Sequence, residues 1–148
     1  MAASARIKKT KTILVVDDDP ENVRNYSEIL RDLDYQVIAR GDVDAALELL
    51  QGDTAVDLAI TDYRMPGKTG LDFILALRQL RPILPVVMIT AYGNIETYLH
   101  SISLGAFEYV NKPIKKKEFE RIVQHALDNN KLKNPSGKDG NGKYSCHR

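Results

Sequence analysis

Apolar and polar residues occur in blocks along this chain, and the blocks predict a series of strands. Five short runs are rich in β-branched and other apolar residues: residues 13–16, 35–39, 58–61, 86–89 and 107–110. Each has the length and composition of a buried strand, bounded by turn-forming or charged residues. The first, third, fourth and fifth runs stop at Asp17, Asp62, Thr90 and Asn111.

Between these runs, apolar residues recur every three or four positions, which predicts helices. The first helix is expected to have Asp19 as its N-cap and Pro20 at its first position. Its buried stripe is expected to contain Val23, Tyr26 and Leu30. Four more helices are expected near residues 42–52, 71–81 and 95–105 and after Pro113.

Strands and helices therefore alternate as five βα units. Because crossovers between parallel strands are right-handed, this order predicts an α/β fold, a three-layer flavodoxin-like (βα)5 sandwich. The expected parallel five-stranded sheet has the order 2-1-3-4-5. In such a sheet, ligands bind at the carboxyl ends of the strands, where the strand order reverses. That point lies between the strands that end at Asp17-Asp18 and at Asp62.

Five polar side chains are expected to converge at this edge: the carboxylates of Asp17, Asp18 and Asp62, the Thr90 hydroxyl and the Lys112 ammonium. Carboxylates brought together repel one another unless a cation or a proton intervenes. Oxygen ligands favour a hard cation such as Mg²⁺, which takes one or two carboxylates together with water and phosphate oxygens. The sequence thus predicts a site for a divalent cation and a phosphoryl group.

The same residues, in this order and at this spacing, resemble the receiver domain of two-component response regulators. The resemblance covers residues 11–130 and rests on Asp17-Asp18, on Asp62 followed by Met65-Pro66-Gly67 and Gly70, on Thr90-Ala91, and on Tyr109 with Lys112-Pro113. It implies a phosphoacceptor switch rather than an enzyme. Such a switch accepts a phosphoryl group on Asp62 and assists its own Mg²⁺-dependent phosphorylation and dephosphorylation.

The resemblance also implies how the cation is held. Asp18, Asp62 and the backbone carbonyl of Arg64 are expected to bind Mg²⁺ directly, and Asp17 through a bound water molecule. The side chains of Arg64 and Tyr92 are expected to border the phosphoryl group and to slow its hydrolysis. Nucleophilic attack by a carboxylate on phosphorus is a recognised covalent route.

The remaining implied roles concern signalling. Lys112 is expected to contact Asp62 or a phosphoryl oxygen, next to a Lys-Pro bond that can be cis. Thr90 is expected to bind the phosphoryl group, and Tyr109 to turn inward in response. A sensor histidine kinase or phosphotransfer protein is the implied phosphodonor. An unknown effector is the implied target, and the face of the fourth helix, fifth strand and fifth helix is a candidate homodimer surface.

Composition and charge narrow the function further. The chain has 148 residues with 43% hydrophobic and 28% charged residues, and its single cysteine, Cys146, permits no intrachain disulfide. We expect a basic extension over residues 1–10 and a polar basic tail or linker over 131–148. Residues 12–130 carry 12 bases and 19 acids, a net charge of −7. This acidic body disfavours nucleic-acid binding by the domain, and without an apolar span the expected location is cytoplasmic.

Two other classes of protein share parts of this pattern. A phosphohydrolase of the haloacid-dehalogenase kind also uses an aspartyl nucleophile after a strand. However, Glu21 stands where that family has Thr or Val, and the chain has no room for a cap domain. A flavodoxin-like electron carrier shares the fold, but the carboxylates after the first strand would repel a flavin phosphate.

Within the receiver family, residues 89–94 also resemble receivers attached to sigma-54-dependent activators.

Overall fold

Strands and helices alternate along residues 10–91 and 93–133, the part of the chain that the computed structural model describes. The strands in this part of the chain are β1 (Thr12–Val16), β2 (Gln36–Arg40), β3 (Leu58–Thr61), β4 (Val86–Thr90) and β5 (Glu108–Asn111). The helices are α2 (Pro20–Asp32), α3 (Val43–Gln51), α4 (Gly70–Leu80), α5 (Ile95–Ser103) and α6 (Lys116–Lys133).

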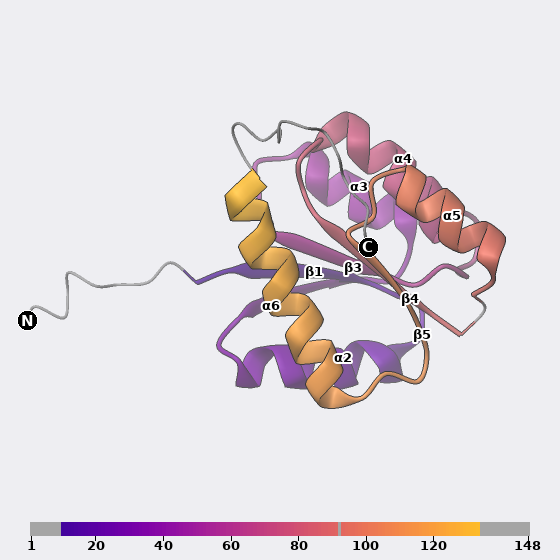
Figure 1. Ribbon diagram of the computed structural model, residues 1–148. Helices are drawn as coiled ribbons and strands as arrows, with labels where there is room; N and C mark the ends of the chain where they lie inside the picture. The colour runs from indigo at the N-terminus through magenta and orange to yellow at the C-terminus, as the bar shows by residue number, and fades with distance from the viewer. Residues whose placement is uncertain (1–9, 92, 134–148) are drawn as a thin grey trace, which may run out of the picture.

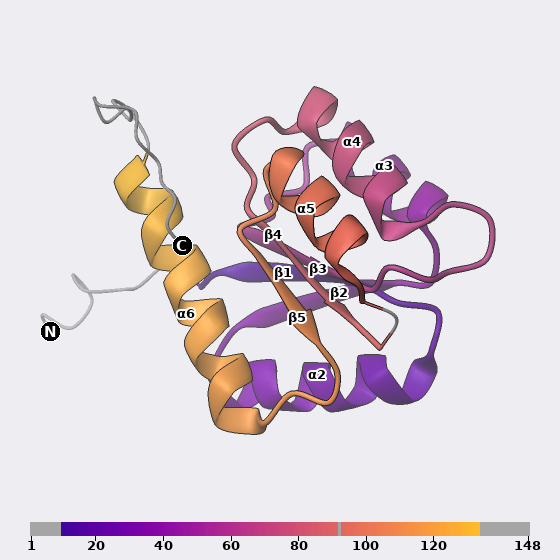
Figure 2. The same ribbon diagram turned by 45° about the vertical axis from the view of Figure 1, so that its right-hand side comes forward.

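The strands form one parallel sheet of order β2-β1-β3-β4-β5. Helices α2 and α6 cover one face of this sheet, and α3, α4 and α5 cover the other (Figures 1 and 2). The predicted three-layer α/β sandwich and its strand order are therefore confirmed.

The sheet is buried on both faces, which explains why its central strands are continuous apolar runs rather than alternating ones. Successive side chains of β1 point to opposite faces of the sheet. Leu14 and Val16 pack toward α3 and α4, and Ile13 and Val15 pack toward α2 and α6. All four side chains are fully buried, as expected for an interior strand of the sheet.

Local signals in the sequence fix where the helices begin. Asp19 caps α2 by accepting a hydrogen bond from the Glu21 N–H, and Pro20 is the first helical residue, as predicted. Asn94 caps α5 through a reciprocal pair of bonds with Thr97. These caps set the ends of the helices nearest the carboxyl edge of the sheet.

Several predicted features lie outside the described residues. They are the basic extension up to residue 9, the part of the tail from residue 134, and the side chain of Tyr92. None of the helices within residues 10–91 and 93–133 combines the length and apolar character needed to cross a bilayer.

Candidate functional site

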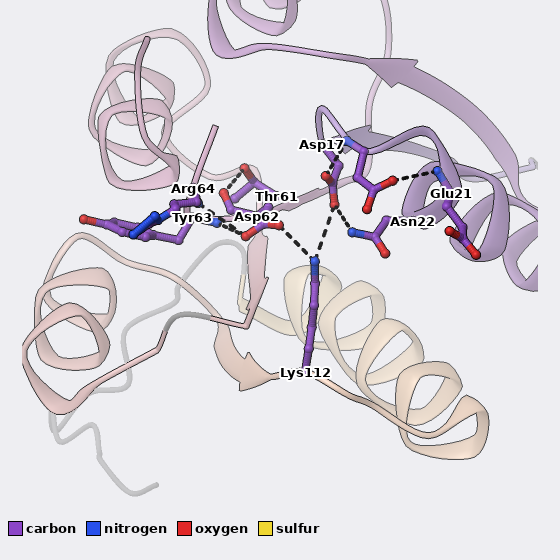
Figure 3. A network of polar contacts seen from close by, with 9 residues as sticks. Asp17, Glu21, Asn22, Thr61, Asp62, Tyr63, Arg64 and Lys112 are labelled. Carbon is purple, nitrogen blue, oxygen red and sulfur yellow. Dashed lines mark hydrogen bonds and ion pairs between the residues drawn. The ribbon is translucent and has the colours of Figure 1, made fainter. Parts of the chain in front are cut away.

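Two carboxylates lie side by side at the carboxyl ends of neighbouring strands, as Figure 3 shows. Asp17 directly follows β1, and its N–H donates to the Arg40 carbonyl at 3.1 Å. Asp62 directly follows β3, and its N–H donates to the Val16 carbonyl at 3.2 Å. Because these bonds extend the sheet ladder by one residue, both carboxylates are held inside the molecule, with 4% and 8% of each residue exposed.

Lys112 brings a positive charge to this pair from the end of β5. Its N–H donates to the Thr90 carbonyl at 2.9 Å, which fixes its backbone against β4. Its ammonium lies 2.9 Å from Asp62 Oδ2 and 3.8 Å from Asp17 Oδ2. The Lys112-Pro113 bond is cis, in agreement with the expectation from the sequence. The structure thus brings Asp17, Asp62 and Lys112 together.

The second oxygen of Asp62 is held by the loop that follows it. Asp62 Oδ1 accepts hydrogen bonds from the backbone N–H groups of Tyr63, at 2.5 Å, and Arg64, at 3.4 Å. The first residue of α4 packs against the same loop. A Cβ atom at Gly70 would lie 2.3 Å from the Asp62 carbonyl oxygen, so only glycine allows this approach. The loop therefore fixes the orientation of the candidate phosphoacceptor.

Asp17 is held from the side of α2. Its Oδ1 accepts from the Asp19 N–H at 3.0 Å, and its Oδ2 accepts from the Asn22 amide at 3.2 Å. Burial raises the pKa of the Asp17 carboxyl above its usual range. These hydrogen bonds and the Lys112 ammonium offset only part of that effect, and the charge of Asp62 adds to it. The site therefore concentrates negative charge that water does not fully solvate.

The donor set suits a hard divalent cation. Asp17 and Asp62 supply buried carboxylate oxygens, and with Lys112 between them they leave a net charge of about −1. Asp18, the next residue after Asp17, is exposed. Among the described residues, no group of three or more His, Cys, Asp or Glu side chains is close enough to hold a metal ion. The roles of Asp18 and of the Arg64 carbonyl as ligands stay predictions.

Thr90 and Tyr109 lie on adjacent strands beside this site. Thr90 is fully buried, and Tyr109 is 9% exposed. The Tyr109 hydroxyl forms a hydrogen bond with Thr97 Oγ1 at 2.6 Å and accepts from the Asn94 N–H at 3.2 Å. A Cβ atom at Gly93 would lie 2.7 Å from this hydroxyl, so the loop before α5 closes over it. Tyr109 already points inward here, and its coupling to Thr90 stays a prediction.

Sequence reasoning missed three side chains that contribute to the site. Asn22 bonds Asp17, and Thr97 bonds Tyr109. Tyr26, one helical turn after Asn22, lines the space beneath Asp17 and Asp62. The spacing of Asn22 and Tyr26 on the inward face of α2 was a usable signal, because residues four apart lie on one side of a helix.

Comparison with known proteins gives a consistent result. The family model of the response regulator receiver domain matches residues 13–124. The response regulator PilR of Pseudomonas aeruginosa is 35% identical over 127 residues, which is 85% of this chain and 27% of PilR. The transcriptional regulatory protein CpxR of Escherichia coli K12 is 37% identical over 115 residues, 78% of this chain and 48% of CpxR.

Solved structures agree with these sequence matches. A CheY-like receiver domain protein from Methanospirillum hungatei superposes with a TM-score of 0.81 at 26% identity, covering 84% of this chain and 99% of that one. NtrX from Brucella abortus gives a TM-score of 0.78 at 34% identity, covering 84% of this chain and 29% of that one. The chain spans between about a quarter and a half of the curated relatives named above.

Proposed function

The chain belongs to the response regulator receiver family, and from that membership we propose that it accepts a phosphoryl group on Asp62. The phosphodonor is a histidine kinase or a phosphotransfer protein, and the receiver acts as a phosphorylation-controlled switch rather than as an enzyme with an external substrate. Lys112 carries this proposal, because its ammonium sits 2.9 Å from a carboxylate held at a strand end. An ammonium in that position neutralises charge that develops during phosphoryl transfer.

The chemistry follows from the geometry around Asp62. A carboxylate oxygen of Asp62 attacks the phosphorus atom, and the bond from phosphorus to the donor nitrogen breaks. The electron pair returns to the imidazole ring, which remains on the partner. The Tyr63 N–H keeps the orientation of Asp62 during the transfer. Lys112, now bound to Asp62 Oδ2, is free to move to a phosphoryl oxygen.

A divalent cation completes this site. Mg²⁺ would supply charge neutralisation between the carboxylates and the incoming phosphoryl oxygens. Asp17, Asp18 and Asp62 would hold it, together with the Arg64 carbonyl. The supporting observation is the raised pKa of Asp17 beside the charged Asp62, since excess buried negative charge favours cation binding. Hydrolysis of the acyl phosphate would return the receiver to its resting state.

The output is proposed to pass through α5, β5 and α6. Tyr109, on β5, contacts the first turn of α5 through Asn94 and Thr97. Ile95, Leu99 and Ile102 of α5 are 70%, 58% and 39% exposed and lie on one stripe of the helix. Such a stripe suits a downstream effector or a second copy of the receiver. We place this switch in the cytoplasm, with no direct binding to nucleic acid.

Acetyl phosphate with Mg²⁺ tests the proposal directly. The intact protein should gain the mass of one phosphoryl group, and the adduct should be lost at alkaline pH, as acyl phosphates are. Asp62→Asn, which preserves shape and removes the nucleophile, should abolish the adduct. Asp72→Asn offers a matched control, because Asp72 is an exposed cap residue of α4.

The outcomes separate the proposal from its alternatives. A label that maps to a serine, threonine or histidine would refute the role of Asp62. Continuous release of phosphate from many substrates, with no stable adduct, would indicate a phosphohydrolase. A flavin bound to the purified protein, seen by its visible absorbance, would indicate an electron carrier. Phosphorylation without Mg²⁺ would refute the proposed role of the cation.

A further inference from the structure

A groove runs along α2 beside β2, the strand at one edge of the sheet. It has a volume of about 490 Å³, which is within the range of sites that bind small molecules. Arg24, Ser27 and Arg31 line it from α2, and Ala39 and Gly41 line it from the end of β2 and the turn that follows. The groove therefore opens near the carboxyl edge of the sheet, where ligands bind in folds of this class.

Two arginines lie on this side of α2. Positions seven apart are two helical turns apart, so Arg24 and Arg31 project in nearly the same direction, about 10 Å from each other along the axis. Both are exposed, and within residues 10–91 and 93–133 neither guanidinium pairs with a carboxylate or donates a hydrogen bond. Glu28 also lines the groove and pairs with neither arginine, although side chains three and four residues apart are neighbours on a helix. Both guanidinium groups thus keep their donors for a ligand.

Ser27 lies between the two arginines and is only 5% exposed. Its hydroxyl forms no hydrogen bond with any described residue. In this part of the chain, every side-chain oxygen that is sealed from solvent has a hydrogen-bond partner, so the Ser27 hydroxyl must be reached by solvent. The groove that Ser27 lines has the room for this contact. Because polar groups on buried residues are normally paired, we infer that this hydroxyl takes its partner from the groove.

We propose that this groove binds a small phosphate monoester, at a site separate from Asp62 and independent of the phosphoacceptor chemistry. Arg24 and Arg31 balance the two negative charges of the phosphate, and their planar donor groups match its oxygens. Ser27 donates to a further oxygen of the phosphate, and the Glu28 carboxylate accepts from hydroxyl groups on the rest of the ligand. Asp17 also borders the groove, but the Lys112 ammonium at 3.8 Å offsets its charge.

Titration of ¹⁵N-labelled protein without Mg²⁺ tests the site, with glucose 6-phosphate, inorganic phosphate and glucose as probes. Glucose 6-phosphate should shift the amides of Ser27 and Gly41 saturably, inorganic phosphate should do so at higher concentration, and glucose should not. Loss of a hydrogen bond to a charged group weakens binding by roughly 10- to 100-fold, which is the effect expected of Arg24→Gln and of Arg31→Gln. Ser27→Ala should weaken binding by roughly 2- to 10-fold without lowering the melting temperature, because its hydroxyl has no described protein partner to lose. Arg121→Gln, at an exposed arginine of α6, is the matched control.

Several results would overturn this inference. Shifts that do not saturate, or that are equal in Arg24→Gln and Arg121→Gln, would show a general effect of ionic strength. Shifts centred on Asp62 and Lys112 would assign the phosphate to the phosphoacceptor site. A tetraglutamate peptide that shifts the Ser27 amide when glucose 6-phosphate does not would assign the groove to an acidic protein segment instead. The proposed function is tested separately, because Arg24→Gln should leave phosphorylation by acetyl phosphate unchanged.

Discussion

The contact between Tyr109 and the start of α5 allows a quantitative prediction. Tyr109→Phe removes one hydroxyl, which bonds Thr97 Oγ1 at 2.6 Å and accepts from the Asn94 N–H at 3.2 Å. The phenylalanine ring keeps its edge-to-face contact with Tyr98, whose ring centre is 5.6 Å away. The substitution therefore tests the two hydrogen bonds and leaves the packing of the ring in place.

The magnitude follows from what each partner retains. Each of the two bonds contributes about 0.5–1.5 kcal/mol net. The Asn94 N–H keeps a second acceptor, Thr97 Oγ1 at 3.3 Å, and Thr97 Oγ1 keeps the Asn94 carbonyl at 3.2 Å. Neither group is left unpaired, so the loss should be about 1–2 kcal/mol. If the first turn of α5 opens locally, its amide hydrogens should exchange roughly 5- to 30-fold faster.

Native-state hydrogen exchange measures this directly. The informative amides are those of Thr97 and Tyr98, which donate at 2.9 Å to the Asn94 side chain and carbonyl respectively. Tyr98→Phe is the control, because it removes a neighbouring hydroxyl that bonds no described residue and is partly exposed. Exchange at Thr97 and Tyr98 that rises no more in Tyr109→Phe than in this control would refute the claim that Tyr109 stabilises the start of α5.

Three further predictions concern stability, each measured by urea unfolding with an unchanged m-value. Gly70→Ala should destabilise the protein by about 1–3 kcal/mol, because the added methyl meets the Asp62 carbonyl. The variant should also be phosphorylated more slowly. Unchanged stability and unchanged phosphorylation would contradict the packing described. Asp17→Asn should stabilise the protein without Mg²⁺ at neutral pH. Since the folded-state pKa of Asp17 is raised, the folded protein holds this proton more tightly, so the gain should shrink as the pH falls below that pKa; a gain that grows with acid would contradict this. Arg78→Met should destabilise the protein by about 2–4 kcal/mol, because the guanidinium donates to five backbone carbonyls. The control Arg121→Met, at an exposed ion pair, should change stability by less than about 0.5 kcal/mol. Equal effects of the two substitutions would refute the claim that the Arg78 hydrogen bonds stabilise the fold.

Much of the architecture was predictable because its causes are local. The strands are short apolar runs, and the polar residue that ends each run also marks the carboxyl edge of the sheet. Asp19 and Pro20 fix the start of α2 by a cap and by the rigid proline ring, neither of which needs a distant partner. The strand order followed from the βα alternation, since right-handed crossovers leave few arrangements.

The candidate site was predictable in its composition but not in its detail. Parallel strands bring their carboxyl ends together, so the convergence of Asp17, Asp62 and Lys112 followed from the topology. The sequence could not say which of two adjacent acids is buried. Asp17 continues the ladder through the Arg40 carbonyl and stays inside, and Asp18, one residue later, is exposed. The repulsion expected between buried carboxylates therefore acts on Asp17 and not on Asp18.

Contacts between distant segments were decided by the tertiary structure alone. Tyr26 occupies the same apolar stripe as Leu30, and only the packing of α2 against α6 stacks its ring on Phe119, where it also lines a small space with Asp17 and Asp62. The guanidinium of Arg78 reaches the carbonyls of Leu104 and Gly105, which no helical spacing relates to it. Local pattern specifies which face of an element is apolar. The partner that each polar tip meets depends on how the elements pack, and that is a property of the whole fold.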